Sequence, residues 1–300
     1  QLAAILKEEG TQHWSTIVDI QPSGSKPPIF WIHSLGGDGG GGFFYYRRLA
    51  ELLGPDQPSF GIRSPQEPFD RIDLMARHYI REIKKRQPNG PYFLGGFCFG
   101  GNVAYEMATQ LVEQGEKVGM LILLESSPPK TVDANAGFNA NAALYSIENL
   151  YENLKDFVHQ DASSQLAALK QKSQQWRKRI QNKLAPQQEK PQLKEVIDMS
   201  HYPKDYVKYA ETHWEAINHF VPRPFPGQIH LFRARKQPLR SFNPTFGWEQ
   251  LVEDRVHVTV IPGTHESMLQ EPNVQVLANK LNQLLAQSHG LVTGSTRLAA

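Results

Sequence analysis

The chain has 300 residues and a mass of 33.9 kDa, which suits one large domain or one domain with a sizeable insertion. Its formal net charge of +2 argues against binding to nucleic acid or to an anionic membrane surface. The single cysteine excludes an internal disulfide and a metal site built from thiolates. The longest strictly apolar runs, such as Met120–Leu124, are too short to cross a bilayer, so we expect a cytoplasmic protein.

The first half of the chain alternates strand-type and helix-type segments. Residues 1–26 are polar and end in "QPSGSKPP", which is typical of a linker. The apolar runs that follow predict strands at 29–33, 58–62, 92–97 and 118–125. Helices are predicted between them, at 43–53, at 71–87 and from Cys98 to near Gly115.

The alternation stops after the strand at 118–125 and resumes near the end of the chain. Residues 126–220 have helix-type sequence without a convincing strand, which indicates a helical insertion. Strands are then predicted at 227–234 and 256–263, and a closing helix at about 272–287. We therefore expect an α/β domain over 27–290 with a mostly parallel sheet, followed by a tail at 291–300 that is disordered or was added in cloning.

The only cysteine lies in "GFCFG" (96–100), directly between a predicted strand and a predicted helix. The pattern G-x-C-x-G in this setting is typical of a nucleophile elbow, whose glycines avoid collisions between strand and helix. The amino end of the helix would also favour a thiolate at Cys98. The alternative is a cysteine packed as a small hydrophobic residue, which the strand–turn–helix context makes the weaker interpretation.

A nucleophile of this kind requires a histidine base and an orienting acid, in the chain order nucleophile, acid, histidine. His265 follows the last predicted strand in "IPGTHESML" and is the candidate base. Glu125 ends an apolar strand and is the candidate acid, because catalytic groups gather at the carboxyl ends of parallel strands. Asp254, in a polar turn, is the reserve candidate. The loop "FRARKQP" after the penultimate strand contains no carboxylate.

The oxyanion hole of such a site uses two backbone amides. One is that of Phe99, the residue after the nucleophile. The other comes from the loop after the first core strand, where the Leu35 amide in "HSLGGDGG" is the candidate.

Together these segments resemble the type I thioesterase domains of nonribosomal peptide and polyketide assembly lines, which have the α/β-hydrolase fold. The resemblance covers nearly the whole chain, including "PYFLGGFCFGGNVAYEMATQL", "LILLESSPP" and "VIPGTHESMLQEPNVQVLANKL". It departs from the family pattern where Cys98 replaces the usual Ser and Glu125 replaces the usual Asp. The "HSLGG" loop also lacks the Pro and small residue that the family more often shows.

The resemblance implies a chain-terminating thioesterase without a cofactor of its own. Its substrate would be an acyl or peptidyl thioester on the 4′-phosphopantetheine arm of an upstream carrier protein domain. The chain would pass to Cys98 and leave by hydrolysis or by cyclisation to a lactam, lactone or macrocycle. Because a cysteine acyl-enzyme remains a thioester, Cys98 would suit a demanding release step.

The insertion at 126–220 corresponds to the helical lid of that family. Its basic segment 170–184, which includes Trp176, is either a docking face for an acidic carrier protein or an ordinary solvated helix face. Its apolar residues either line an acyl channel or pack the lid onto the core; we single out Phe138, Leu144, Leu150 and Tyr151.

Two other functions fit parts of the sequence. A free-standing cysteine hydrolase similar to dienelactone hydrolase also has G-x-C-x-G, but such proteins lack the long insertion and place their acid after the later strand. A non-catalytic module that only binds a carrier protein would not need Cys98, Glu125 and His265.

Overall fold

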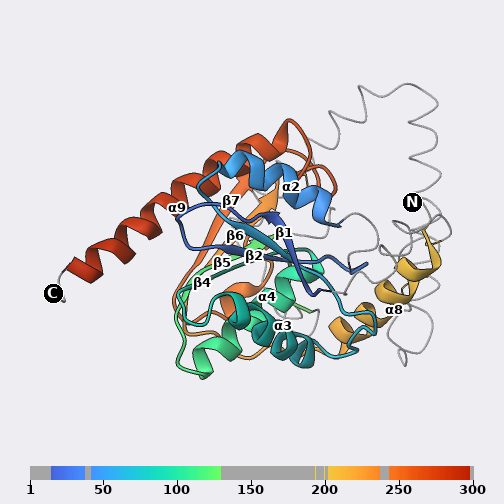
Figure 1. Ribbon diagram of the computed structural model, residues 1–300. Helices are drawn as coiled ribbons and strands as arrows, with labels where there is room; N and C mark the ends of the chain where they lie inside the picture. The colour runs from blue at the N-terminus through green and yellow to red at the C-terminus, as the bar shows by residue number, and fades with distance from the viewer. Residues whose placement is uncertain are drawn as a thin grey trace, which may run out of the picture.

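The computed structural model describes residues 15–37, 42–129, 193, 199, 202–236 and 243–297 (Figure 1). Seven strands form one sheet in the order β1-β3-β2-β4-β5-β6-β7, parallel except for the antiparallel pair β1 and β3. Their bounds are β1 Ile17–Gln21, β2 Ile29–Ile32, β3 Ser59–Ile62, β4 Tyr92–Phe97, β5 Val118–Leu124, β6 Ile229–Ala234 and β7 Val256–Ile261. Each strand expected from the sequence is present, and the predicted α/β-hydrolase class is confirmed.

The register of the central strands aligns their carboxyl ends. Phe97 at the end of β4 pairs with Leu124 at the end of β5, and Leu124 pairs in turn with Phe232 of β6. The loops that follow β2, β4, β5, β6 and β7 therefore leave the sheet at one edge. All three candidate triad residues come from these loops.

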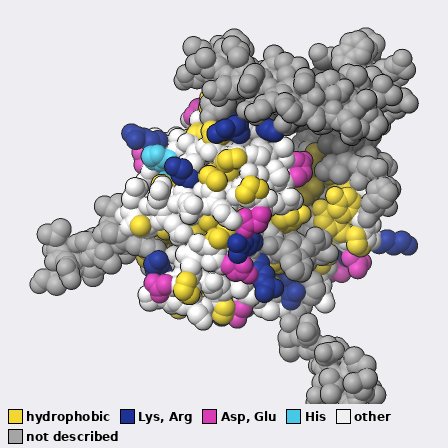
Figure 2. All heavy atoms as spheres, turned by 90° about the horizontal axis from the view of Figure 1, so that it is seen from above, with side chains coloured by type: hydrophobic (Ala, Val, Ile, Leu, Met, Phe, Trp, Pro, Cys, Tyr) yellow, Lys and Arg dark blue, Asp and Glu magenta, His cyan; other side chains and the backbone are white. Residues whose placement is uncertain are grey.

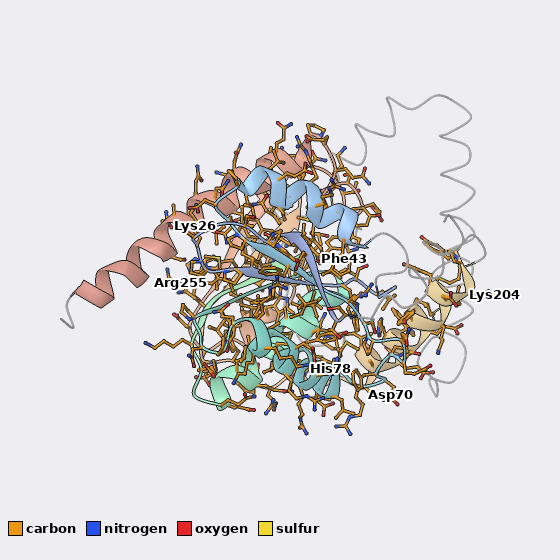
Figure 3. All side chains as sticks on the ribbon, viewed as in Figure 1. Lys26, Phe43, Asp70, His78, Lys204 and Arg255 are labelled. Carbon is orange, nitrogen blue, oxygen red and sulfur yellow. The ribbon has the colours of Figure 1, made fainter. Side chains whose placement is uncertain are left out.

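Helices cover both faces of the sheet, as Figure 1 shows. Helices α2 (Gly42–Leu53) and α9 (Asn273–Arg297) pack side by side on one face, and α3 (Ile72–Arg86) and α4 (Phe99–Glu113) on the other. Figure 3 labels Phe43 of α2 and His78 of α3, which mark the two faces. The apolar stripe predicted for α3 is the buried one; it consists of Ile72, Met75, Ala76, Tyr79, Ile80 and Ile83.

Two predicted boundaries are wrong at the ends of the domain. Residues 1–26 were expected to form a linker, but Ile17–Gln21 of this segment form edge strand β1, which pairs with β3. Its alternation of apolar and polar residues, "IVDIQ", suits an edge strand exposed on one side. At the other end α9 continues to Arg297, well past the predicted stop near 287. Gly290 and Gly294 do not end it, because extending an established helix costs less than starting one.

The insertion is described only in part. Its last segment is helix α8 (Lys204–His219), which agrees with the predicted helical character of 126–220. Lys204, labelled in Figure 3, marks the start of this helix. The basic segment 170–184 and the four apolar residues singled out above lie outside the described residues.

The surface carries charges of both signs. Figure 2 shows Lys and Arg side chains interspersed with Asp and Glu on the face seen from above, in keeping with the small net charge. In the part of the chain that the structure describes, no helix combines the length and apolar character needed to span a membrane.

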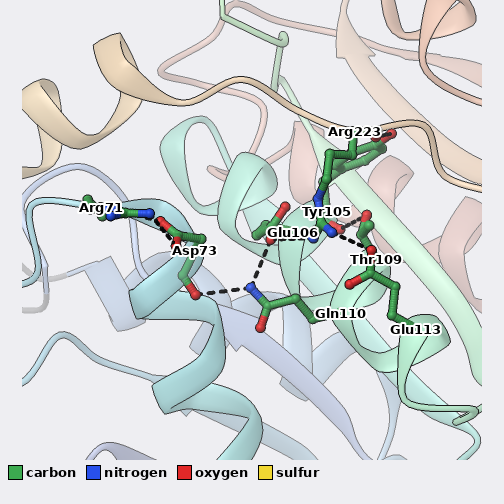
Figure 4. A network of polar contacts seen from close by, with 8 residues as sticks. All are labelled: Arg71, Asp73, Tyr105, Glu106, Thr109, Gln110, Glu113 and Arg223. Atoms are coloured by element: carbon green, nitrogen blue, oxygen red, sulfur yellow. Dashed lines mark hydrogen bonds and ion pairs between the residues drawn. The ribbon is translucent and has the colours of Figure 1, made fainter.

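The segment that follows α8 is anchored to α4 by a buried carboxylate (Figure 4). Arg223 binds Glu106 at 2.9 Å and also pairs with Glu113, and the Tyr105 hydroxyl donates to the Arg223 carbonyl at 2.7 Å. Glu106 also accepts a hydrogen bond from Gln110 at 2.8 Å. The Glu106 side chain is 3% exposed, and burial raises its pKa. This network fixes the end of the insertion to the helix that begins at the cysteine.

We predict that Arg223→Ala destabilises the fold by about 1–2 kcal/mol at pH 8, because it leaves a buried carboxylate without its cation. The loss is modest because Arg223 is 47% exposed and solvent screens the pair. Losing the cation raises the pKa of Glu106 further, so the carboxyl protonates as pH falls and the loss should shrink at pH 5. Urea unfolding at both pH values measures this.

Arg71→Ala is the matched control, because Arg71 pairs with Asp73 on the exposed side of α3, and little or no change is expected. Equal destabilisation of the Arg223 variant at pH 5 and pH 8 would contradict a role for the Glu106 charge.

Candidate active site

Cys98 occupies a strained turn between β4 and α4. Its backbone angles are φ 54° and ψ −117°, a combination that non-glycine residues rarely adopt. The Cys98 amide donates to Leu124 O at 2.9 Å and its carbonyl accepts from the Gly101 amide at 3.2 Å, which holds the turn from both sides. Cys98 as a whole is partly exposed and does not belong to the buried core.

The glycines around Cys98 allow the strand and the helix to approach closely. A Cβ at Gly96 would lie 2.2 Å from the Gly100 carbonyl carbon, and a Cβ at Gly100 would lie 2.5 Å from His33 O. Both contacts involve backbone, which cannot move aside cheaply. The predicted steric reason for G-x-C-x-G is therefore seen in the structure.

Tyr46 of α2 holds the residue before this turn through its hydroxyl group, and the sequence analysis did not predict this contact. Its buried hydroxyl accepts a hydrogen bond from the Phe97 amide at 2.7 Å and donates to Ile32 O at 3.0 Å. Tyr46 thus joins the ends of β2 and β4. In the sequence "FFYYRRL", Tyr46 is indistinguishable from the other apolar residues of a helix.

Glu125 follows β5 and is held in place by β6. Its amide donates to Phe232 O at 2.8 Å, and its Oε1 accepts a hydrogen bond from the Ala234 amide. The side chain is 3% exposed and its Oε2 faces His265 Nδ1 at 3.4 Å. The end of β6 therefore supplies a backbone amide that orients the acid.

Asp254, the reserve acid, lies elsewhere. It is exposed and precedes β7, whereas His265 follows that strand. Because the strands are parallel, Asp254 is at the opposite edge of the sheet from Cys98. The geometry brings Glu125, and not Asp254, to the histidine.

His265 lies between the acid and the cysteine. Its ring packs against Phe97, with 4.7 Å between the ring centroids, and its side chain is 38% exposed. Nδ1 of His265 faces Glu125, which leaves Nε2 for Cys98, the residue whose side chain helps to raise the pKa of this imidazole. The structure thus brings together the three side chains predicted as a triad.

Burial and partners act in opposite directions on the pKa of His265. Burial of the ring lowers this pKa, but the hydrogen bonds and charges of Cys98 and Glu125 outweigh burial and raise the pKa to about 10. The imidazole is therefore held in its protonated form at neutral pH.

The two candidate oxyanion donors lie at the same edge of the sheet. Phe99 is the first residue of α4, so its amide has no acceptor within the helix. Among the described residues, none accepts a hydrogen bond from the Leu35 amide in the loop after β2. Two buried histidines that the sequence analysis missed, His33 and His213, contact this loop.

The described residues do not form a metal site: they hold no group of three or more His, Cys, Asp and Glu side chains arranged to bind a metal ion.

Comparison with known proteins identifies the same family that the sequence motifs resemble. The family model described as "Thioesterase domain" matches residues 27–285. Indigoidine synthase of Dickeya dadantii (strain 3937) is 40% identical over 138 residues, which cover 44% of this chain and 9% of that protein. The chain therefore corresponds to a small part of this curated relative.

Two solved structures are similar over most of the chain. AB3403, a four-domain nonribosomal peptide synthetase crystallised with AMP and glycine, is 25% identical with a TM-score of 0.63 over 94% of this chain and 21% of its own. The thioesterase domain of NocB, from the nocardicin cluster, is 22% identical with a TM-score of 0.58 over 90% of this chain and 99% of its own. The similarity to the NocB domain shows a shared fold and no more. From the match of the family model across the sheet and its flanking helices, the chain belongs to the thioesterase domain family.

Proposed function

We propose that this chain is the chain-terminating thioesterase of an assembly line, with Cys98 as nucleophile, His265 as base and Glu125 as orienting acid. The observation that carries the proposal is the place of His265, which contacts Glu125 Oε2 through Nδ1 and whose pKa is raised by the side chain of the partly exposed Cys98. A buried structural cysteine would need neither a strained turn nor a charged imidazole beside it.

The substrate proposed is an acyl or peptidyl chain on the phosphopantetheine thiol of a carrier protein domain. Membership of the thioesterase family supports a thioester as the bond that is attacked. The multidomain nature of AB3403 supports delivery of this thioester by another domain. The reaction needs no cofactor, because the nucleophile, the base and the amide donors all belong to the chain.

In the first step the Cys98 sulfur attacks the thioester carbonyl carbon while its proton resides on His265 Nε2. The carbonyl π electrons move to oxygen, and the amides of Phe99 and Leu35 stabilise the resulting oxyanion. When the carbon–sulfur bond to phosphopantetheine breaks, His265 returns the proton to the departing thiol. Glu125 keeps the imidazole oriented and stabilises its positive charge.

In the second step water, or an amine or hydroxyl of the bound acyl or peptidyl chain, attacks the carbonyl carbon of the Cys98 thioester. The sulfur of this thioester is uncharged, so one cause that raises the pKa of His265 is removed and the ring can accept the proton of the attacking group. The carbon–sulfur bond to Cys98 then breaks, its electron pair leaves on the sulfur, and the product is released. A thioester intermediate remains more reactive than the ester that a serine would form, and it favours attack by amines. We therefore propose release by cyclisation, with hydrolysis as the competing outcome.

We expect a covalent acyl group on Cys98 after mixing the protein with butyryl-N-acetylcysteamine. Intact-mass spectrometry should show the added butyryl mass on the native protein and none on Cys98→Ala. The Cys98→Ser protein should acylate more slowly, because a hydroxyl is the poorer nucleophile at neutral pH.

Absence of any adduct and of turnover with thioesters would favour a module that only binds carrier proteins. Turnover of small lactones alone would favour a hydrolase of the dienelactone type.

We predict that Cys98→Ala lowers the pKa of His265 from about 10, since it removes the sulfur partner and leaves burial less opposed. An NMR titration of the His265 ring carbons measures the pKa in both proteins. The Cys98→Ser variant should fall between them, because its hydroxyl keeps a hydrogen bond without a charge. The same pKa in all three proteins would mean that the ring and the sulfur do not interact.

Glu125→Gln should lower the rate of acylation by roughly 10⁴-fold, the loss found when the acid of a serine triad is removed or neutralised. The substitution keeps the side-chain length and an oxygen for the Ala234 amide, so the stability should change little. Asp254→Asn is the matched control and should leave the rate unchanged. Stopped-flow acylation with the same thioester measures both, and a larger effect at Asp254 would reverse the assignment of the acid.

A further inference from the structure

The loop after β2 has its two central peptide groups held by two different imidazoles. The first is the Ser34–Leu35 peptide, which includes the Leu35 amide. Its carbonyl oxygen accepts hydrogen bonds from His33 Nδ1 at 2.7 Å and from the Gly37 amide at 3.1 Å. Because a trans peptide directs its N–H opposite to its C=O, these contacts fix the direction in which the Leu35 amide points.

The second is the Leu35–Gly36 peptide, which is held from the insertion. His213 of α8 donates from Nδ1 to Leu35 O at 2.6 Å. Two tyrosines of the same helix pack on the following glycines: a Cβ at Gly36 would lie 1.9 Å from Tyr206 Cε2, and one at Gly37 would lie 3.1 Å from Tyr209 Cδ1. The peptides on both sides of the Leu35 Cα are therefore clamped, which fixes the backbone angles of Leu35.

Both imidazoles are arranged to donate from Nδ1. A carbonyl oxygen only accepts, so Nδ1 carries the proton in each ring. The other nitrogen then accepts from a hydroxyl, with Tyr79 Oη 2.7 Å from His33 Nε2 and Ser64 Oγ 3.2 Å from His213 Nε2. Burial lowers the pKa of both rings, that of His213 to about 4, so both are neutral near pH 7. Both side chains are 0% exposed.

The rings of His33 and His213 also lie beside Phe99, whose amide is the other candidate oxyanion donor. The His213 ring stacks on Phe99 with centroids 5.0 Å apart and on His33 with centroids 4.8 Å apart. Phe99 follows the nucleophile, and its amide begins α4. One buried stack therefore connects both candidate amides with helix α8.

We propose that His33 and His213 are positioning residues that hold the Leu35 amide as an oxyanion donor, with His213 supplied by the insertion. The inference rests on the proposed function, since an oxyanion donor has a role only if Cys98 attacks a carbonyl group. Neither histidine contacts the reacting atoms. Each acts through a peptide of the loop, and no step of the reaction requires either ring to change its protonation.

His213 offers the sharper test, because two substitutions separate its hydrogen bond from its ring. His213→Phe keeps a stacking ring and removes the donor to Leu35 O. His213→Asn removes the ring, but its amide nitrogen can occupy the place of Nδ1 and keep the donor. We expect the Phe variant to lose about 10- to 100-fold in acylation rate, less than the cost of deleting an oxyanion donor. The Asn variant should stay within about threefold of the native protein, since that donor is retained.

Two probes distinguish a displaced amide from general damage. Butyryl-N-acetylcysteamine requires an oxyanion hole, whereas alkylation of Cys98 by iodoacetamide forms no oxyanion. His213→Phe should slow single-turnover acylation without changing the thioester concentration for half-maximal rate, and should leave the alkylation rate unchanged. Inhibition by 1,1,1-trifluoro-2-heptanone, which adds the sulfur to its carbonyl and places negative charge on oxygen, should weaken in parallel with acylation.

Equal acylation rates in the native and His213→Phe proteins would overturn the proposal, as would an equal fall in acylation and alkylation. If thermal unfolding shows that the Phe variant does not fold, Ser64→Ala replaces it. That change frees His213 Nε2 and should slow acylation by about 3- to 10-fold at an unchanged alkylation rate, a fraction of the cost of losing the donor; no change would again overturn the proposal. Failure of the proposed function is a different result, because the native protein would then be alkylated by iodoacetamide yet not acylated by the thioester.

Discussion

The arrangement of the site depends on the strained backbone of Cys98. The turn at this residue is sustained because its amide binds the end of β5, its carbonyl binds the first turn of α4, and glycines occupy the positions where side chains would collide. A positive φ at a non-glycine residue costs free energy, which the surrounding contacts must offset. The strained turn places the Cys98 side chain at the carboxyl edge of the sheet, where Glu125 and His265 also lie.

Each of the other groups is placed by a neighbouring strand. The end of β5 supplies Glu125, the end of β6 supplies the amide that binds its carboxylate, and the loop after β7 supplies His265. The Tyr46 hydroxyl links the ends of β2 and β4 by hydrogen bonds to Ile32 and Phe97, the residue before Cys98. Because the strands are parallel and in register, residues far apart in sequence meet at one edge of the sheet. The chemistry therefore depends on the sheet as much as on the side chains.

Much of this could be predicted from local sequence, and the rest could not for identifiable reasons. Periodicity predicted the strands and the apolar face of α3, because burial in a layered fold imposes those patterns. Cys98, Glu125 and His265 could be singled out because each directly follows a strand. The function of Tyr46, and of His33 and His213, depends on hydrogen bonds between distant segments, and no local pattern signals those. The ends of the domain were misjudged because polar residues in an edge strand and glycines in a long helix resemble linker sequence.

The hydrogen bond from His213 to the Leu35 carbonyl has a consequence for protein engineering. An insertion between two strands of a sheet can be exchanged between related domains. Here α8, the last helix of the insertion, is hydrogen-bonded to the loop after β2, so a graft that ends before α8 and one that includes it are different experiments. A chimaera that keeps α8 native retains this hydrogen bond, whereas one that replaces α8 also changes a contact of the loop after β2.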